Sequence, residues 1–258
     1  MTHEMAPAAQ EVAQGAQRAR RLRVLMAHWD GGGNGPPQRA LARELARRGH
    51  DVHVLTHGSL AGAVAADGGK FHALATTPQW DPAQPRTGEE EGAFVVQNIV
   101  GSSAFAADFF AVRDEVHPDF CLIDAMLVST VNLAIERDLP FAAINHIAWI
   151  TEGGCAGFLN SITATLPGPA AGSTFFELLE RAPLVLATSY REFATPPDFG
   201  PHIHFVGPIR EPAPTGLGRA ALRIGRSFWS ASAACIKARK RRCGTSAKRC
   251  RVCRLMFW

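Results

Sequence analysis

One glycine-rich segment contains residue types that could bind a phosphate. Residues 28–37 read HWDGGGNGPP and directly follow the short apolar run LRVLMA. Glycines let backbone N–H groups approach a phosphate at the start of a helix, as in dinucleotide-binding proteins. Here Pro36 and Pro37 remove two of those donors, and the next apolar run ends in Leu55-Thr56-His57, with no acid to bind a ribose. The segment therefore argues against a nicotinamide-dependent dehydrogenase.

Other catalytic and metal-binding signatures are missing from the sequence. It contains no GxSxG, HExxH or P-loop motif, so a hydrolase, a zincin or an NTPase has no support. The pair Cys250-x-x-Cys253 has no second pair and no histidine near it, and it would make a poor zinc site. We expect no metal, and we treat the following histidines as structural: His50, His53, His57, His72, His117, His202 and His204.

Short apolar runs alternate with helical patterns along most of the chain. The predicted strands are 22–27, 51–55, 70–75, 120–123, 141–144, 184–187 and 204–206, and the predicted helices are 38–48, 93–116, 127–137 and 175–181. Residues 81–92 read as a polar loop and 145–172 as a looser stretch. This alternation predicts an α/β domain with a doubly wound, mostly parallel, Rossmann-like sheet and helices on both faces.

Composition divides the chain into unlike parts. The 258 residues are 47% apolar and 19% charged, as in an ordinary globular protein. We predict a disordered leader (1–21), one folded domain (22–206), a proline-rich linker (207–215) and a tail (216–258) that carries 12 Lys or Arg and no acid. Neither a secretory signal nor a membrane-length apolar run is evident, so we expect a cytoplasmic protein without an integral membrane segment.

Three blocks of sequence, in order, resemble one enzyme family. Residues 24–57 (VLMAHWDGGGNGPPQRALARELARRGHDVHVLTH) are similar to the opening of nucleotide-sugar-dependent glycosyltransferases of the GT-B fold, such as bacterial relatives of macrolide glycosyltransferases and of UDP-glucuronosyl and UDP-glucosyl enzymes. Residues 117–146 resemble their fourth and fifth strands. LVLATSYREFATP and HIHFVGPIREP resemble the end of their first domain, so the resemblance covers about residues 22–214.

The resemblance implies a metal-independent, inverting transfer of a hexose-type sugar from a nucleoside diphosphate to an acceptor hydroxyl. The first domain of the family binds the acceptor and the second binds chiefly the donor. No cofactor is expected, because the nucleotide sugar is a co-substrate, and this chain would bind it only if a second domain were present.

The family residue that removes the acceptor proton, a His or an Asp, corresponds here to Asn34, which is not a useful base. Three interpretations follow: Asn34 only orients the acceptor, a neighbour such as His28 or Asp30 takes the proton, or the acceptor chemistry differs. We favour His28 or Asp30, although His28 could simply end a strand and Asp30 could shape a turn. Asp124 matches the acid that orients the base, or it caps the next helix.

An acceptor pocket is predicted beyond the fifth strand. His146, Trp149, Phe158 and Leu159 would line it, and their apolar character suggests a lipophilic acceptor such as a natural-product aglycone, sterol or lipid. The alternative for these aromatic and aliphatic residues is simple packing. Gly153-Gly154 would let this loop move as a lid.

The basic tail has the composition of a GC-rich gene translated out of frame. Reading the codons of Phe228-Trp229-Ser230 one base earlier begins a buried-strand pattern that runs into a Ser/Gly loop, as expected of the first strand of a second domain. We predict a frame loss between about residues 214 and 227, no nucleic-acid partner for the basic run, and negligible transferase activity for this chain alone. The alternative function is a non-catalytic, single-domain protein that binds a lipophilic ligand.

Overall fold

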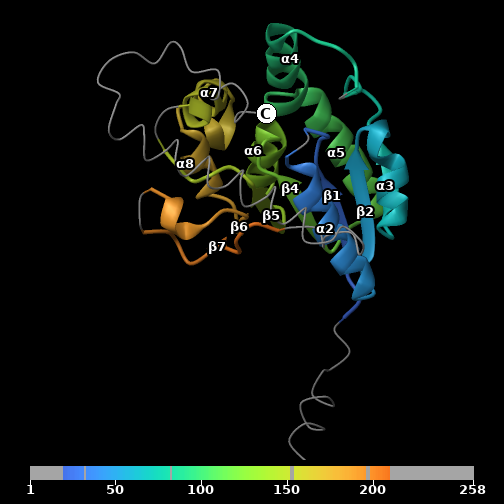
Figure 1. Cartoon of the computed structure of the whole chain (residues 1–258). Helices are drawn as coiled ribbons and strands as arrows, with labels where there is room; N and C mark the ends of the chain where they lie inside the picture. Colours follow the sequence, from blue (N-terminus) through green and yellow to red (C-terminus); the bar gives the residue numbers. More distant parts are fainter. Residues whose placement is uncertain (1–19, 32, 82, 152–153, 196–197, 210–258) are drawn as a thin grey trace, which may run out of the picture.

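Seven short segments pair as parallel strands of one sheet in the computed structural model, which describes residues 20–31, 33–81, 83–151, 154–195 and 198–209. The strands are β1 (Arg23–Ala27), β2 (Asp51–Thr56), β3 (Lys70–Ala73), β4 (Phe120–Asp124), β5 (Phe141–Asn145), β6 (Val185–Ala187) and β7 (Ile203–Phe205). Their order in space is β3-β2-β1-β4-β5-β6-β7 (Figure 1). The parallel, Rossmann-like α/β fold is therefore confirmed.

Both faces of the sheet are covered, which explains why the central strands are almost continuously apolar. Successive side chains of a strand point to opposite faces. Leu25 and Ala27 of β1 join one buried cluster with side chains of the helices at 103–116, 128–136 and 175–179. Val24 and Met26 join another with side chains of the helices at 35–47 and 61–66. Two hydrophobic cores thus enclose the sheet.

The helices connect successive strands. They are α2 (Gly35–Arg47), α3 (Ala61–Ala66), α4 (Gly88–Val95), α5 (Ser103–Val116), α6 (Val128–Glu136), α7 (Gly154–Thr163) and α8 (Phe175–Leu179), with a π-helical turn at Val96–Val100 and 3-10 turns at Gly58–Leu60, Gly168–Ala170 and Arg191–Phe193. α7 and α8 lie toward the β6–β7 end of the sheet, and α3 lies at the opposite end, beyond β2 (Figure 1).

Several helices differ from the sequence prediction. α2 begins at Gly35 rather than at residue 38, because Pro36 and Pro37 fit the first turn of a helix, where no N–H partner is needed. α4 lies partly in the predicted polar loop, where Thr87 and Glu90 form a reciprocal capping box. α7 occupies part of the predicted looser stretch, and no helix was predicted at α3.

One helical stretch, 88–116, is long and apolar enough by length and composition to cross a membrane. It is the single such stretch within the described ranges, and half of its most apolar window is buried inside the protein. Phe105 and Phe109 are fully buried in the core on one face of the sheet. The stretch serves as core helices here.

Some predictions concern residues outside the described ranges. These are the leader up to residue 19, the linker from residue 210, the tail 216–258 and Gly153 of the predicted lid.

Candidate functional site

The carboxyl ends of β1, β4 and β5 bring polar side chains together at the point where the strand order reverses. β1 leads into the glycine-rich loop and α2, and it lies between β2 and β4 in the sheet. In open α/β sheets, ligands bind beyond the carboxyl ends of the strands at such a switch point. Asn34, Asp124 and His146 come from these three strand ends.

Asn34 and Asp124 are in direct contact. The Asn34 side chain donates from Nδ2 to Asp124 Oδ2 at 2.6 Å and to the Trp29 carbonyl at 3.1 Å. It precedes α2 but makes no capping hydrogen bond to that helix. Asp124 is fully buried and Asn34 is 2% exposed. The amide therefore holds the carboxylate away from water, where a charge-assisted hydrogen bond is strong.

Asp124 has two further neighbours. Its Oδ1 accepts a hydrogen bond from the Met126 backbone N–H at 2.9 Å, and it lies 3.5 Å from His146 Nδ1. The first contact shapes the turn before α6, and the second places an imidazole beside the carboxylate. Among the described residues, α6 itself receives no side-chain capping hydrogen bond at its N-terminus, so Asp124 does not cap it. The role of Asp124 in orienting a base stays a prediction.

His28 is enclosed by the protein. It is 1% exposed, and its backbone N–H donates to the Leu55 carbonyl at 3.3 Å, which ties the end of β1 to β2. Burial lowers the pKa of His28, and the Asp124 carboxylate opposes this only in part. The imidazole is therefore neutral at pH 7. Its role as a base stays a prediction.

His57, interpreted from the sequence as structural, lies close to His28. It is fully buried, and its Nδ1 accepts a hydrogen bond from the Trp80 N–H at 2.9 Å. Burial, together with the neighbouring His28, lowers the pKa of His57 to about 4. Its position after β2, at the carboxyl edge of the sheet, is the signal that could have drawn attention to it.

Asp30 faces a different neighbour. Ser59 Oγ donates to Asp30 Oδ2 at 2.9 Å, so the carboxylate links the loop after β1 to the 3-10 turn after β2. The side chain is partly exposed. Its role as a base also stays a prediction.

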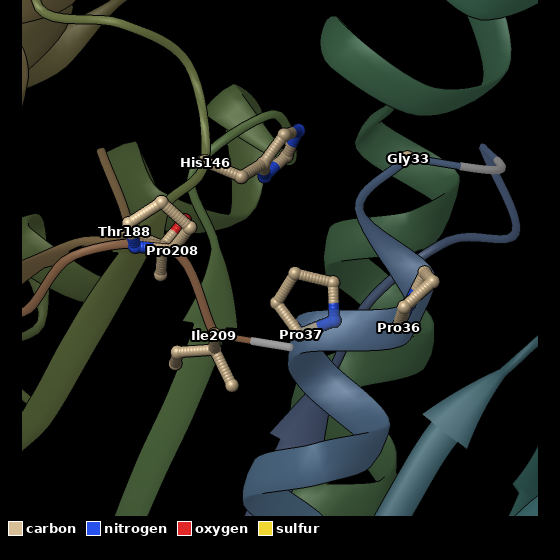
Figure 2. A pocket seen from close by; sticks show the side chains of 7 residues that line it. All are labelled: Gly33, Pro36, Pro37, His146, Thr188, Pro208 and Ile209. Atoms are coloured by element: carbon tan, nitrogen blue, oxygen red, sulfur yellow. The ribbon is translucent and has the colours of Figure 1, made fainter. Parts of the chain in front are cut away.

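A cavity of about 420 Å³ lies beside this cluster. Figure 2 shows the start of α2 on one side and the segments after β5, β6 and β7 on the other. The lining residues are Gly33, Pro36, Pro37, His146, Thr188, Pro208 and Ile209. Of the four predicted acceptor residues, His146 alone contributes to this cavity.

Trp149 and Leu159 are fully buried in the core instead. The Trp149 ring packs on Phe176, with ring centroids 4.8 Å apart, and meets Phe199 edge-on at 5.4 Å. Phe158 is 38% exposed on α7. For Trp149 and Leu159, the structure shows the packing that the sequence had left as the alternative, because an apolar loop residue cannot be assigned to a core or to a pocket before the loop is placed.

The described part of the chain holds neither a cluster of metal-binding side chains nor a thiol with a lowered pKa. No three His, Cys, Asp or Glu side chains gather there as a metal site would require. Burial raises the pKa of Cys121 to about 12 and also raises that of Cys155, so neither thiol is activated.

The fold matches solved glycosyltransferase structures. The glycotransferase of kitacinnamycin is similar with a TM-score of 0.54 and 18% identity, over 75% of this chain and 53% of that chain. CalG4, the calicheamicin glycosyltransferase, is similar with a TM-score of 0.52 and 20% identity, over 73% of this chain and 53% of that chain. This chain has a glycosyltransferase fold.

The match confirms the fold that the three sequence blocks had implied. The chain spans about half the length of the two glycosyltransferases it matches. No family model and no curated protein matches it by sequence.

Proposed function

We propose that this chain is the acceptor-binding half of a cytoplasmic glycosyltransferase, which transfers a hexose-type sugar from a nucleoside diphosphate to a hydroxyl of a lipophilic acceptor. Transfer would invert the anomeric centre and need no metal. The observation that carries the proposal is a cavity beside the buried Asn34–Asp124 pair at the switch point of a glycosyltransferase fold.

The composition of the cavity wall supports the acceptor class. Pro36, Pro37 and Ile209 offer apolar surface, whereas His146 and Thr188 supply polar groups. Its volume lies within the range of about 300 to 1,000 Å³ that is usual for small-molecule sites. An apolar body that carries one hydroxyl would match this distribution.

A cavity-filling substitution tests acceptor binding by the purified chain. A side chain at Gly33 would meet no atom within 4 Å of its Cβ, so Gly33→Phe should fold and occupy the cavity. We expect the affinity for 1-naphthol, measured by isothermal titration calorimetry, to fall by at least about tenfold. Gly62→Phe is the matched control, because Gly62 is exposed on α3 and equally open. Absence of naphthol binding in the parent chain would contradict the proposal.

The donor-binding half is proposed to be encoded downstream in a shifted frame. We therefore expect no sugar transfer from the 258 residues alone with any nucleoside diphosphate sugar. Resequencing the codons for residues 212–258 and several hundred bases beyond should reveal a one-base correction that opens a frame through a second α/β domain. An unchanged sequence without such a domain would favour the single-domain binding protein.

A further inference from the structure

The imidazole of His146 lies between Asp124 and the cavity. Its Nδ1 is 3.5 Å from Asp124 Oδ1. This nitrogen is buried and has no hydrogen-bond partner among the described residues, although the side chain as a whole is 18% exposed. The exposed part of His146 is therefore on its other atoms. His146 lines the cavity, and with the proton on Nδ1 beside the carboxylate the basic lone pair is on Nε2.

The backbone that carries His146 is held in place. The Thr188 N–H donates to the Asn145 carbonyl at 2.8 Å, and Asn145 Oδ1 accepts from the Ile147 N–H at 3.1 Å. These bonds attach the end of β5 to the end of β6 and form a tight turn around His146. A group with this support can keep its orientation while a ligand binds.

The other candidate bases are less well placed. His28 is buried and Asp30 is bonded to Ser59, and neither lines the cavity. The Asn34 amide has no basic lone pair on nitrogen, and its Nδ2 already donates to Asp124.

We propose that His146 is the general base for the acceptor, with Asp124 as its positioning residue. This inference rests on the proposed function. The acceptor O–H gives its proton to His146 Nε2, and the oxygen forms a bond to the anomeric carbon of the nucleoside diphosphate sugar. The bond from that carbon to the phosphate oxygen breaks, and its electron pair leaves with the nucleoside diphosphate. The charge of Asp124, whose Oδ1 lies 3.5 Å from Nδ1, stabilises the imidazolium, as the acid of a catalytic triad does.

A chromophoric phenol tests proton acceptance without a donor sugar. The probe is 4-nitrophenol, whose phenolate absorbs visible light. Its binding to the full chain is first measured by calorimetry, and the bound probe is then titrated with pH. We expect the pH at which half of the bound probe is ionised to lie about one unit below that of the free probe, because a protonated His146 stabilises the phenolate.

Matched variants distinguish the residues. His146→Gln should return the midpoint to that of the free probe while the probe still binds. Asp124→Asn should move it part of the way back, which a purely structural role would not do. His204→Gln is the control, because His204 is exposed on β7, and it should not change the midpoint. Circular dichroism confirms that each variant folds.

Different negative results would contradict the role of His146 and the proposed acceptor binding. Binding of the probe to the parent chain without a midpoint shift would overturn the role of His146 and leave acceptor binding intact. Loss of the shift in His28→Gln or Asp30→Asn, with the shift retained in His146→Gln, would transfer the role to that residue and also overturn the inference. Absence of probe binding in the parent chain would remove the proposed function and the inference with it.

Discussion

Two buried carboxylates of this protein have very different surroundings. Asp108 of α5 is 4% exposed, and its hydrogen-bond donors within the described part of the chain are the backbone N–H groups and the hydroxyls of Thr76 and Thr77. Asp124 accepts from Asn34 and Met126 and faces the imidazole of His146 beside a cavity. Burial raises the pKa of Asp108, but the hydrogen bonds from Thr77 and Thr76 outweigh it and hold the pKa below its usual value.

The difference separates a structural carboxylate from a candidate functional one. Asp108 is saturated by neighbouring donors and fastens the segment after β3 to α5. Beside Asp124, by contrast, Asn34 Oδ1 and His146 Nδ1 are buried without hydrogen-bond partners among the described residues. Buried polar groups are normally satisfied, so such a concentration is expected where a ligand or water completes the site.

The largest effect is expected from removing the saturated carboxylate. Asp108→Ala leaves the buried N–H and hydroxyl of Thr77 without acceptors, and the free energy of unfolding should fall by about 3 kcal/mol. Urea denaturation followed by circular dichroism measures this. Asp114→Ala, on the same helix but with a 64% exposed side chain, should change it by less than about 0.5 kcal/mol. If the two substitutions lower the free energy of unfolding equally, Asp108 does not have the structural role described here.

Protonation of the buried His57, the neighbour of His28, should reduce the stability of the protein at a higher pH than protonation of Asp108 does. The unfolded His57 imidazole binds a proton as the pH falls below its ordinary value of 6.5, whereas the folded one resists until about 4. Stability is therefore lost in that window, by about 2 kcal/mol between pH 7 and 5. His57→Gln should remove this share of the pH dependence in urea unfolding, and the control His204→Gln should retain it. Identical slopes for parent and His57→Gln would contradict the burial argument.

The lowered pKa of Asp108 makes the stability of the protein depend on pH in a more acidic range than His57 does. Its contribution to stability is present above the ordinary carboxyl pKa of about 4 and is lost as the pH falls through the lower folded value. The stability difference between the parent chain and Asp108→Ala should therefore be constant from pH 5 to 7 and shrink below about pH 4. A difference that shrinks already at pH 6 would show that another group is responsible.

A smaller effect is expected from Asn34. Asn34→Ala removes the 2.6 Å hydrogen bond to Asp124, and the free energy of unfolding should fall by about 1 kcal/mol. Asn132→Ala is the control, since Asn132 bridges Pro167 and Ala170 away from the cavity. Both variants should lose stability in urea, but only Asn34→Ala should alter 4-nitrophenol binding. If Asn34→Ala binds 4-nitrophenol with the affinity of the parent chain, Asn34 is not part of the acceptor site.

Most of the sheet could be predicted because buried parallel strands are short, nearly continuous apolar runs. The helices were less accessible to prediction. α3 (AGAVAA) has one buried apolar anchor, Val64, and gives almost no periodic signal. α4 begins with charged residues, and only the Thr87–Glu90 capping box reveals its start.

The residues of the candidate site could be named from sequence, but their contacts could not. The family resemblance singled out Asn34 and Asp124, which are 90 positions apart, and the parallel order of β1 and β4 brings them into contact. The same patterns treated Trp149 and His146 alike, as residues of one loop. Packing places the first in the core and the second at the cavity.

The sequence by itself therefore determined the fold class, the strand ends at which a site must lie, and the absence of a base at Asn34. These features depend on local composition and on the fixed direction of parallel strands. Only the tertiary structure decided which polar groups are saturated, which are buried without partners, and which imidazole faces both the carboxylate and the cavity. Those properties depend on distances of a few ångströms between strands that are far apart in the chain, and no local pattern encodes them.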